Sequence, residues 1–421
     1  MNLIYGEYLE FLKSNGINIA EHKLKEGFYW LDRQIIKAYD TNGDIHKIIR
    51  LATDDELNIS IKTVYENKEF QLESWEKTVE RKKEHLKELE TKSKQLILEQ
   101  IDKNSDKKLK ILSSGGKDSS VVTHLVRDLV NDTQIIFNNT SLDCADTYRH
   151  IKNQDNVHVI NPKEGYYQWR KRLNFVGNRT SRACCTVFKE GAMVDVLDKD
   201  ENYLFFMGMR NEESNTRKGY GDEWRNDKWG SRNWSAVLPI REWTEEDIWL
   251  YILFRDVPIN SKYKKGYARV GCAVACPYYT KSTWVLDQYW YPKQFKRWHK
   301  ILDSDFCDNN KDIILNCTQQ EYHIAWNGGV YRTDPTKEVI EQFANRNNLD
   351  IEIATKYFSH RCEICDKRVK SKEVIAMNLK YNGRNTNKFY CKKDLMKILG
   401  INEEQWENNV NEFKSQDCVL F

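Results

Sequence analysis

The chain has 421 residues, with 66 Lys and Arg against 63 Asp and Glu and a formal net charge of +3. This length allows two or three domains, and the balanced charge excludes a global basic field that would argue for nucleic-acid binding. Eleven cysteines occur without a recognisable signal peptide or an apolar run long enough to cross a membrane. We therefore expect a cytoplasmic protein with reduced thiols and no membrane association, rather than a disulfide scaffold.

The first 105 residues carry no chemical motif. Residues 28–65 predict short strands with a turn at 41–44, and residues 74–101 predict one long charged helix with an apolar stripe. Residues 103–106 form a polar joint to the next segment. We therefore treat residues 1–105 as an N-terminal extension.

A glycine-rich loop follows an apolar, strand-like run and precedes an amphipathic helix pattern. Adjacent glycines let the backbone approach an anion, the helix N-terminus offers unpaired N–H groups, and a lysine adds a point charge. The alternative is a flexible turn with a solvated Lys-Asp pair, which this strand and helix context disfavours. We expect pyrophosphate to bind at Ser113, Ser114, Gly115, Gly116, Lys117, Asp118, Ser119 and Ser120.

Two further strand-like runs end in candidate ligands. Residues 134–138 lead into Asn139, Thr140 and Asp143, and the apolar run 203–207 leads to Arg210. Open α/β sheets bind ligands at the carboxyl ends of their strands, so Arg210 is predicted to contact a phosphate or the adenylate. Asp143 could hold a ribose hydroxyl or magnesium, or could cap a helix.

Thr244 precedes three acidic residues, 245–247, in the pattern of a helix N-cap with carboxylates in the first turn. The helix dipole favours negative charge at this end. We therefore expect these carboxylates to be structural rather than to serve as the acid or base of a reaction.

Two cysteine sets are candidate metal ligands. Cys184, Cys185, Cys272 and Cys276 form a soft-ligand set that suits an iron-sulfur cluster, with buried or reactive thiols as the alternative.

The second set lies near the C-terminus, where Cys-x2-Cys is followed by a strand-like run at 374–377, an Asn-Gly turn and then Cys-x2-Asp. This layout resembles a zinc ribbon or treble-clef knuckle, and reduced cysteines on a hairpin are the alternative. Only three cysteines are present, so His360 or Asp394 must complete a tetrahedron with Cys362, Cys365 and Cys391.

The glycine-rich loop resembles the PP-loop of ATP pyrophosphatases, which cleave ATP between its α and β phosphates. Five further segments resemble, in order, motifs of phosphoadenosine phosphosulfate (PAPS) reductase-like proteins: residues 139–148, 179–189, 207–214, 238–249 and 267–278. The resemblance implies a doubly wound, mainly parallel α/β sheet of the adenine nucleotide alpha hydrolase-like type at 106–305. Residues 306–421 then form a C-terminal region with a small zinc-knuckle-like module at 360–400.

By resemblance, the activity is adenylation. ATP would bind with Mg²⁺, an acceptor would attack the α phosphorus, and Lys117, Lys189 and Arg210 would be the catalytic residues. In iron-sulfur members of the PAPS/APS reductase group, a Cys-Cys pair and a Cys-x2-Cys pair hold a 4Fe-4S cluster, and the pattern is nearest to the DNA phosphorothioation sulfurtransferase subunit. The chain departs from it by the spacing Cys-x3-Cys. The resemblance implies sulfur transfer, with a cysteine desulfurase or thiol as the sulfur donor and a nucleic acid as a possible substrate.

Two alternatives stay open. One is reduction of PAPS or APS, although thioredoxin-dependent reductases end in a Glu-Cys-Gly-x-His type tail that Cys418 and its neighbours match poorly. The other is a non-catalytic, nucleotide-sensing, metal-binding subunit of a nucleic-acid-modifying complex. The cationic and aromatic loop at 217–234 suits an active-site lid better than a base-stacking surface.

Overall fold

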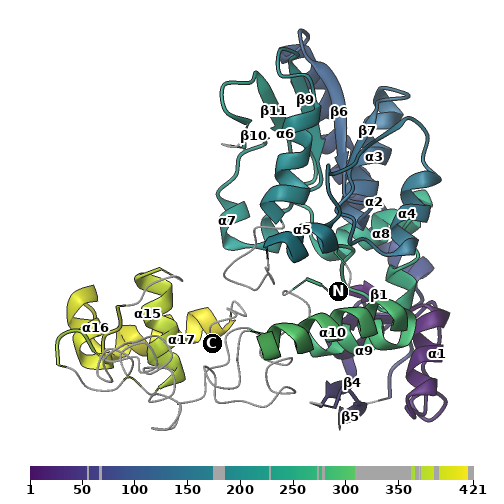
Figure 1. Cartoon of the computed structure of the whole chain (residues 1–421). Coiled ribbons are helices and arrows are strands. Elements are labelled where there is room, and N and C mark those ends of the chain that lie inside the picture. Colours follow the sequence, from purple (N-terminus) through teal and green to yellow (C-terminus); the bar gives the residue numbers. More distant parts are fainter. Residues whose placement is uncertain are drawn as a thin grey trace. The chain divides into compact units, whose positions relative to one another are not determined.

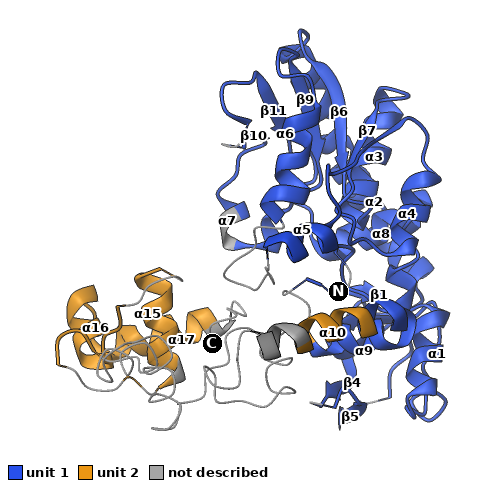
Figure 2. Ribbon diagram, viewed as in Figure 1, with its two compact units in different colours: residues 1–175, 183–276, 281–295 blue, residues 176–182, 277–280, 296–421 orange. Residues whose placement is uncertain are grey.

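The computed structural model describes most of the chain, namely residues 1–54, 56–65, 69–173, 185–226, 229–272, 275–276, 280–308, 362–365, 369, 371–383 and 388–415. The chain divides into two compact units, coloured separately in Figure 2. Unit 1 comprises residues 1–175, 183–276 and 281–295, and unit 2 comprises residues 176–182, 277–280 and 296–421. Among the described helices, none combines the length and apolar content that a membrane crossing requires.

The predicted N-terminal strands are confirmed as a five-stranded antiparallel sheet in the order β1-β2-β3-β4-β5. Helix α1 (Gly6–Ser14) packs its apolar side chains into the same core as this sheet. The predicted turn falls between β3 and β4, where Gly43 has a φ of +88°. The strands are β1 (Asn2–Leu3), β2 (Tyr29–Asp32), β3 (Ile35–Tyr39), β4 (Ile45–Thr53) and β5 (Ile59–Val64).

The long helix is also confirmed, as α2 (Trp75–Lys103), whose N-cap Ser74 accepts a hydrogen bond from the Lys77 amide. Its apolar stripe, which includes Leu86 and Ile97, enters the same core as the central sheet of the PP-loop region. Polar contacts add to this packing, since Ser93 Oγ donates to the carbonyl of Pro239 at 2.7 Å. The extension therefore contributes to the core beneath the candidate site.

A six-stranded sheet forms the centre of unit 1, in the order β10-β11-β9-β6-β7-β8. Five strands are parallel and β10 pairs antiparallel to β11, so the expected mainly parallel sheet is confirmed. Figure 1 shows β9, β6 and β7 side by side. The strands are β6 (Lys108–Ser113), β7 (Ile135–Asn138), β8 (Val157–Ile160), β9 (Tyr203–Met207), β10 (Glu223–Trp224) and β11 (Trp234–Val237).

Helices cover both faces of this sheet. Strand β9 alternates its side chains, with Leu204 and Phe206 in the core shared with α2, α3 and α8, and Phe205 in the core on the opposite face with α6. The unit 1 helices are α3 (Lys117–Leu129), α4 (Ala145–Lys152), α5 (Tyr166–Leu173), η1 (Cys185–Gly191), α6 (Ala192–Val196), η2 (Asn211–Glu213), α7 (Asn215–Lys218), α8 (Glu245–Arg255), η4 (Tyr263–Lys265) and α9 (Lys281–Trp290). Helix α10 (Pro292–Asp308) begins in unit 1 and belongs to unit 2 from residue 296 on.

The strand order reverses direction between β6 and β9. From β6 the chain proceeds to β7 and β8 on one side, and later to β9, β11 and β10 on the other. Such a switch point opens a crevice at the carboxyl ends of the strands, where doubly wound folds bind their ligands. The predicted loop follows β6 and Arg210 follows β9, so the two meet at this position.

Unit 2 contains α15 (Lys372–Tyr381), α16 (Lys392–Leu399) and α17 (Glu403–Ser415) in its described part. The strand expected at 374–377 is wrong, because this run lies inside α15. Ser371 caps the helix, and Val374, Met377 and Asn378 are buried at helical spacing. A short apolar run with β-branched residues fits either structure, and here the cap and the packing decide.

Candidate functional site

The glycine-rich loop at residues 113–120, called the nucleotide loop below, makes a tight turn between β6 and α3. Gly115 has a φ of +71°, and a Cβ there would lie 3.1 Å from the side chain of Thr147. Ser113 Oγ accepts from the Gly115 amide at 3.1 Å, and Ser119 Oγ donates to the Gly116 carbonyl at 2.8 Å. These contacts fix the loop with the N-terminus of α3 at its end, where the first amides of a helix favour an anion.

Gly208, which follows β9, brings a second segment against this helix end. A Cβ at Gly208 would lie 2.7 Å from the backbone carbon of Asp118. Only glycine permits this approach, which places the segment after β9 directly beside the first turn of α3. Arg210 thereby reaches the loop from the neighbouring strand.

Two buried cations meet the loop. Lys117 and Arg210 expose only 6% and 4% of their side chains, and both bind the carboxylate of Asp118. The distances are 2.8 Å from Lys117 Nζ to Asp118 Oδ2 and 2.6 Å from Arg210 Nε to Asp118 Oδ1. Burial alone would raise the pKa of Asp118, but the two cations lower it, so this carboxylate stays ionised.

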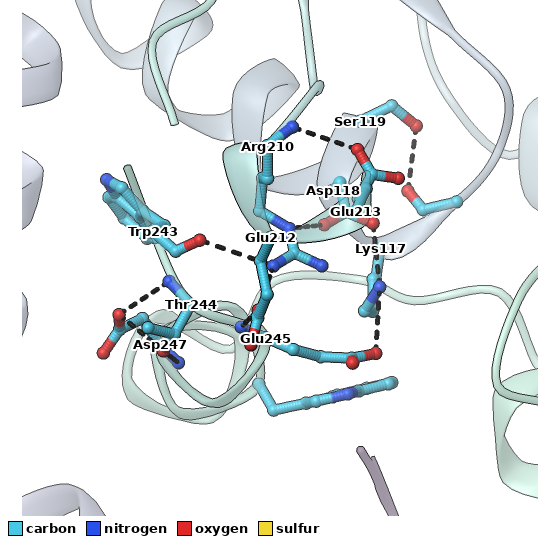
Figure 3. Close-up of polar contacts among 12 residues, drawn as sticks. Lys117, Asp118, Ser119, Arg210, Glu212, Glu213, Trp243, Thr244, Glu245 and Asp247 are labelled. Atoms are coloured by element: carbon cyan, nitrogen blue, oxygen red, sulfur yellow. Dashed lines mark hydrogen bonds and ion pairs between the residues drawn. The ribbon is translucent and has the colours of Figure 1, made fainter. Parts of the chain in front are cut away.

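Carboxylates from two other segments complete the network (Figure 3). Glu212 Oε2 accepts from Arg210 Nη1 at 2.8 Å and from the backbone amide of Glu245 at 2.6 Å. Glu245 Oε1 lies 3.5 Å from Lys117 Nζ. Burial alone would lower the pKa of Lys117, but the neighbouring carboxylates raise it, so the ammonium stays charged.

The first turn of α8 only partly matches the expectation. Thr244 and Asp247 form the predicted capping box, in which the Thr244 amide donates to Asp247 Oδ2 at 2.9 Å and the Asp247 amide donates to Thr244 Oγ1 at 3.1 Å. Glu245, in contrast, faces Lys117 and belongs to the site. Sequence reasoning missed it because a first-turn acid has the same appearance in either role.

A cavity of about 700 Å³ opens over the loop. Its lining includes the loop residues Ser113, Ser114, Gly116, Lys117, Asp118 and Ser119, the neighbours Thr140, Asp143, Lys189 and Arg210, and the aromatic residues Trp224, Trp229 and Tyr263. This volume lies within the range that binds small ligands and cofactors. Lys117, Arg210 and Tyr263 therefore lie with the carboxylate of Asp118 at the loop, and Trp224 and Trp229 also line the cavity.

Other predicted nucleotide ligands lie outside this lining. Ser120 Oγ donates to the Gly116 carbonyl at 3.2 Å, and Asn139 Oδ1 accepts from Ser141 and Tyr148 at 2.8 Å each. Gly115 shapes the turn. Asp143 does line the cavity, and its Oδ2 accepts from Thr140 Oγ1 at 2.6 Å rather than capping α4, whose N-cap is Cys144. Nucleotide binding stays a prediction for all of these residues, both those that line the cavity and Gly115, Ser120 and Asn139, which do not.

Lys189 lies on η1 and lines the cavity next to several thiols. Cys272 is the main neighbour that raises the pKa of Lys189, and burial raises the pKa of Cys272 to about 11 while Lys189 opposes that shift. Cys185 and Cys276 influence the same lysine. Cys184 lies outside the described residues, so the four-cysteine set stays a prediction.

Within the described residues, one group of metal-ligand atoms gathers closely, and it lies in unit 2. The side chains of Cys362, Cys365, Cys391 and Asp394 place their ligand atoms within 4.8 Å of one another. Asp394 Oδ2 lies 3.0 Å from Cys362 Sγ and 3.1 Å from Cys391 Sγ. The Asp394 carboxylate thus lies together with the three thiols, and its role as the fourth ligand stays a prediction, since His360 lies outside the described residues.

Comparisons with known proteins agree with this architecture. A sequence model described as the phosphoadenosine phosphosulfate reductase domain matches residues 108–277. An uncharacterized protein of Methanocaldococcus jannaschii is 28% identical over 250 residues, which are 58% of this chain and 60% of that protein. The adenosine 5'-phosphosulfate reductase of Staphylococcus epidermidis is 26% identical over 190 residues, which are 44% of this chain and 76% of the reductase.

Among solved structures, the PAPS reductase from Candida auris in its phosphate complex covers 45% of this chain and 94% of its own, with 17% identity and a TM-score of 0.34. The chain spans only 60% of the length of its first curated relative. The region that matches the reductase domain, residues 108–277, contains the whole nucleotide loop together with Arg210 and Cys272. Residues 108–277 are therefore similar to the PAPS reductase domain, and this similarity supports a PAPS reductase-like family of PP-loop proteins for this part of the chain.

Proposed function

We propose that the protein cleaves ATP to AMP and pyrophosphate and adenylates an acceptor, as the first step of a sulfur transfer. The observation that carries this proposal is the convergence of Lys117 and Arg210 at the N-terminus of α3, inside a cavity of about 700 Å³. Two buried cations at a helix N-terminus match the charge of a polyphosphate. The intact loop favours ATP over a nucleotide that lacks a β,γ-pyrophosphate.

In this proposal, the loop holds the β and γ phosphates and an acceptor oxygen bonds to the α phosphorus. The bond from the α phosphorus to the bridging oxygen breaks, and pyrophosphate leaves with the electron pair. Lys117 and Arg210 lower the barrier by stabilising charge that develops on the leaving oxygens. Asp118 holds both cations in place before the nucleotide arrives, so little reorganisation is needed. Magnesium would supply further positive charge between the phosphates, with Asp143 as its protein ligand.

The sulfur part of the proposal assigns Cys184, Cys185, Cys272 and Cys276 to an iron-sulfur cluster. Its support is that the three described thiols share one cationic neighbour, Lys189, on the cavity wall. Soft thiolates suit iron, and a nearby cation stabilises their negative charge. When bound, such a cluster would supply electrons or sulfur-binding capacity, while Lys189 would orient the anionic end of the activated intermediate.

Anaerobic purification followed by absorption spectroscopy and metal analysis tests this part of the proposal. We expect a brown protein with four irons per chain, and loss of colour and iron in Cys184→Ser and Cys276→Ser variants. A colourless parent protein without iron would remove the cluster and leave the adenylation step standing.

We further propose that Cys362, Cys365, Cys391 and Asp394 hold a structural zinc ion. Three thiolates and one carboxylate form a closed, four-coordinate set, which is typical of structural zinc. Hydrogen bonds from Cys362 and Cys391 are the main cause that lowers the pKa of Asp394 to about 2, so its carboxylate is available as an anionic ligand.

A nucleotide panel tests the reaction class. We expect the purified protein, supplied with ATP and Mg²⁺, to release pyrophosphate and, with water in place of the acceptor, AMP, as followed by phosphorus NMR. Sulfite release from PAPS or APS with a thiol donor, without ATP cleavage, would favour the reductase instead. The match to adenosine 5'-phosphosulfate reductases is what supports that second candidate. A third outcome, tight ATP binding without turnover, would indicate a nucleotide-sensing subunit of a nucleic-acid-modifying complex.

A further inference from the structure

Tyr263 is a buried residue whose hydroxyl reaches the nucleotide loop from a distant segment. Its Oη accepts a hydrogen bond of 3.0 Å from the backbone amide of Lys117, 146 residues earlier in the chain. Its ring packs edge-on against Trp249 at 5.2 Å, and only 2% of the residue is exposed. The hydroxyl therefore sits rigidly at the N-terminus of α3, where a phosphate would bind.

The hydroxyl hydrogen of Tyr263 has no acceptor among the described residues. The oxygen accepts from the Lys117 amide. A phenol oxygen that accepts through a lone pair keeps its own O–H as a donor, so this hydrogen must donate elsewhere. Because Tyr263 lines the cavity, the open direction for this hydrogen is the cavity itself.

The segment that carries Tyr263 also holds the other side of the loop. Asn260 Nδ2 donates to the Gly115 carbonyl at 3.3 Å and to Thr147 Oγ1 at 3.1 Å. Asn260 and Tyr263 thus bracket Gly116 from one short stretch of chain. This double attachment keeps Tyr263 Oη in register with the loop, as a group that touches a ligand requires.

We propose that Tyr263 is a ligand-contacting residue, whose hydroxyl donates a hydrogen bond to a β or γ phosphate oxygen of the bound nucleotide. This inference rests on the proposed function and deepens it, because it adds a neutral donor to the cations Lys117 and Arg210. A phenol O–H supplies a directional bond to a phosphate oxygen, whereas a lysine ammonium supplies mainly charge.

The test compares Tyr263→Phe with Tyr251→Phe in the full chain. Tyr251 is a matched control, because its ring is equally buried and its hydroxyl meets His124 instead of the cavity. Binding of inorganic pyrophosphate, ATP and AMP is measured by calorimetry. We expect Tyr263→Phe to weaken pyrophosphate and ATP binding about tenfold or more and AMP binding much less, since a hydrogen bond to a charged group is lost. Tyr251→Phe should bind all three like the parent.

A fluorinated tyrosine at position 263 separates ligand contact from a purely structural role. Fluorine makes the hydroxyl a stronger donor and a weaker acceptor without changing the shape of the loop. Donation to phosphate predicts tighter pyrophosphate binding at a pH where the phenol stays protonated. Weaker or unchanged binding would overturn the inference, because fluorination cannot strengthen pyrophosphate binding if the hydroxyl only accepts from Lys117.

If the parent bound neither pyrophosphate nor ATP, the proposed function itself would fail. If the parent bound both and Tyr263→Phe bound them equally well, only this inference would fail.

Discussion

The carboxylate of Asp118 accepts a 2.6 Å hydrogen bond from the guanidinium of Arg210, 92 residues later in the chain. The same carboxylate binds Lys117, so one acidic side chain holds both cations of the loop. Since Lys117 follows β6 and Arg210 follows β9, Asp118 couples the segments that follow these two strands. The nucleotide loop is therefore a preorganised site rather than a flexible turn.

Arg210→Lys is expected to impair catalysis although it keeps the positive charge. The guanidinium bridges Asp118 and Glu212 through separate nitrogens, which a single ammonium on a different stem cannot reproduce. We predict a fall in kcat of roughly 10²- to 10³-fold with a smaller change in KM, measured as pyrophosphate release. Arg149→Lys, at an exposed guanidinium, is the control. A parent-like kcat for Arg210→Lys would remove Arg210 from the catalytic residues.

Leu86→Ala should destabilise unit 1 as a whole, because Leu86 on α2 is fully buried in the core that also contains the central sheet. We expect a loss of about 2–5 kcal/mol in the free energy of unfolding. Leu98→Ala on the same helix, at a residue that is 51% exposed, should change it by less than about 0.5 kcal/mol. Urea unfolding followed by tryptophan fluorescence measures both. If Leu86→Ala changed the free energy of unfolding as little as Leu98→Ala, α2 would not be part of the core.

Asp146 is expected to make the free energy of unfolding of unit 1 decrease as the pH becomes strongly acidic. Burial opposes ionisation, but hydrogen bonds from Ser261, Tyr291 and Lys265 lower the pKa of Asp146 from 3.8 to about 2. Because the folded value is the lower one, this stabilisation is present above pH 3.8 and is lost as the pH falls through about 2. The ionised carboxylate of Asp146 is expected to add about 2 kcal/mol to the free energy of unfolding.

Asp146→Asn should therefore be less stable than the parent at pH 7 and pH 5, with a difference that shrinks between about pH 4 and pH 2. Unfolding free energies at a series of pH values measure this trend. A difference that stays constant over the whole range would mean that the charge of Asp146 contributes nothing.

Zinc content tests the second metal site. We expect about one zinc per chain in the parent, and Asp394→Ala should reduce it and lower the melting temperature of unit 2, because a structural site needs all four ligands. Glu404→Ala, an exposed acid in α17, is the matched control. If Asp394→Ala retained full zinc, the fourth ligand would have to be another residue, such as His360.

Sequence reasoning found the elements that depend on local patterns. The strand-loop-helix arrangement at 108–129, the long helix from Trp75 and the capping box at Thr244 follow from periodicity and cap residues, and the structure confirms them. The structure places Arg210 beside the loop, as expected for a residue that follows the carboxyl end of a buried strand, and its contact with a phosphate stays a prediction. The iron-sulfur ligands and the catalytic roles stay predictions.

Tyr263 and Glu245 could not be found in this way, because their roles depend on contacts between segments far apart in the chain. Tyr263 meets Lys117 across 146 residues, and nothing in its neighbours marks a hydroxyl that faces a loop. The error at 374–377 has a different cause. Its apolar run carries no period that distinguishes a strand from one face of a short helix.

Exchange of labelled pyrophosphate into ATP tests the central claim most directly, since it reports reversible cleavage between the α and β phosphates whatever the acceptor. It is measured with the parent, with Lys117→Ala and with Lys152→Ala, an exposed lysine on α4 as the control. We predict exchange in the parent and in Lys152→Ala, and its loss in Lys117→Ala. Undiminished exchange in Lys117→Ala would contradict the proposed mechanism.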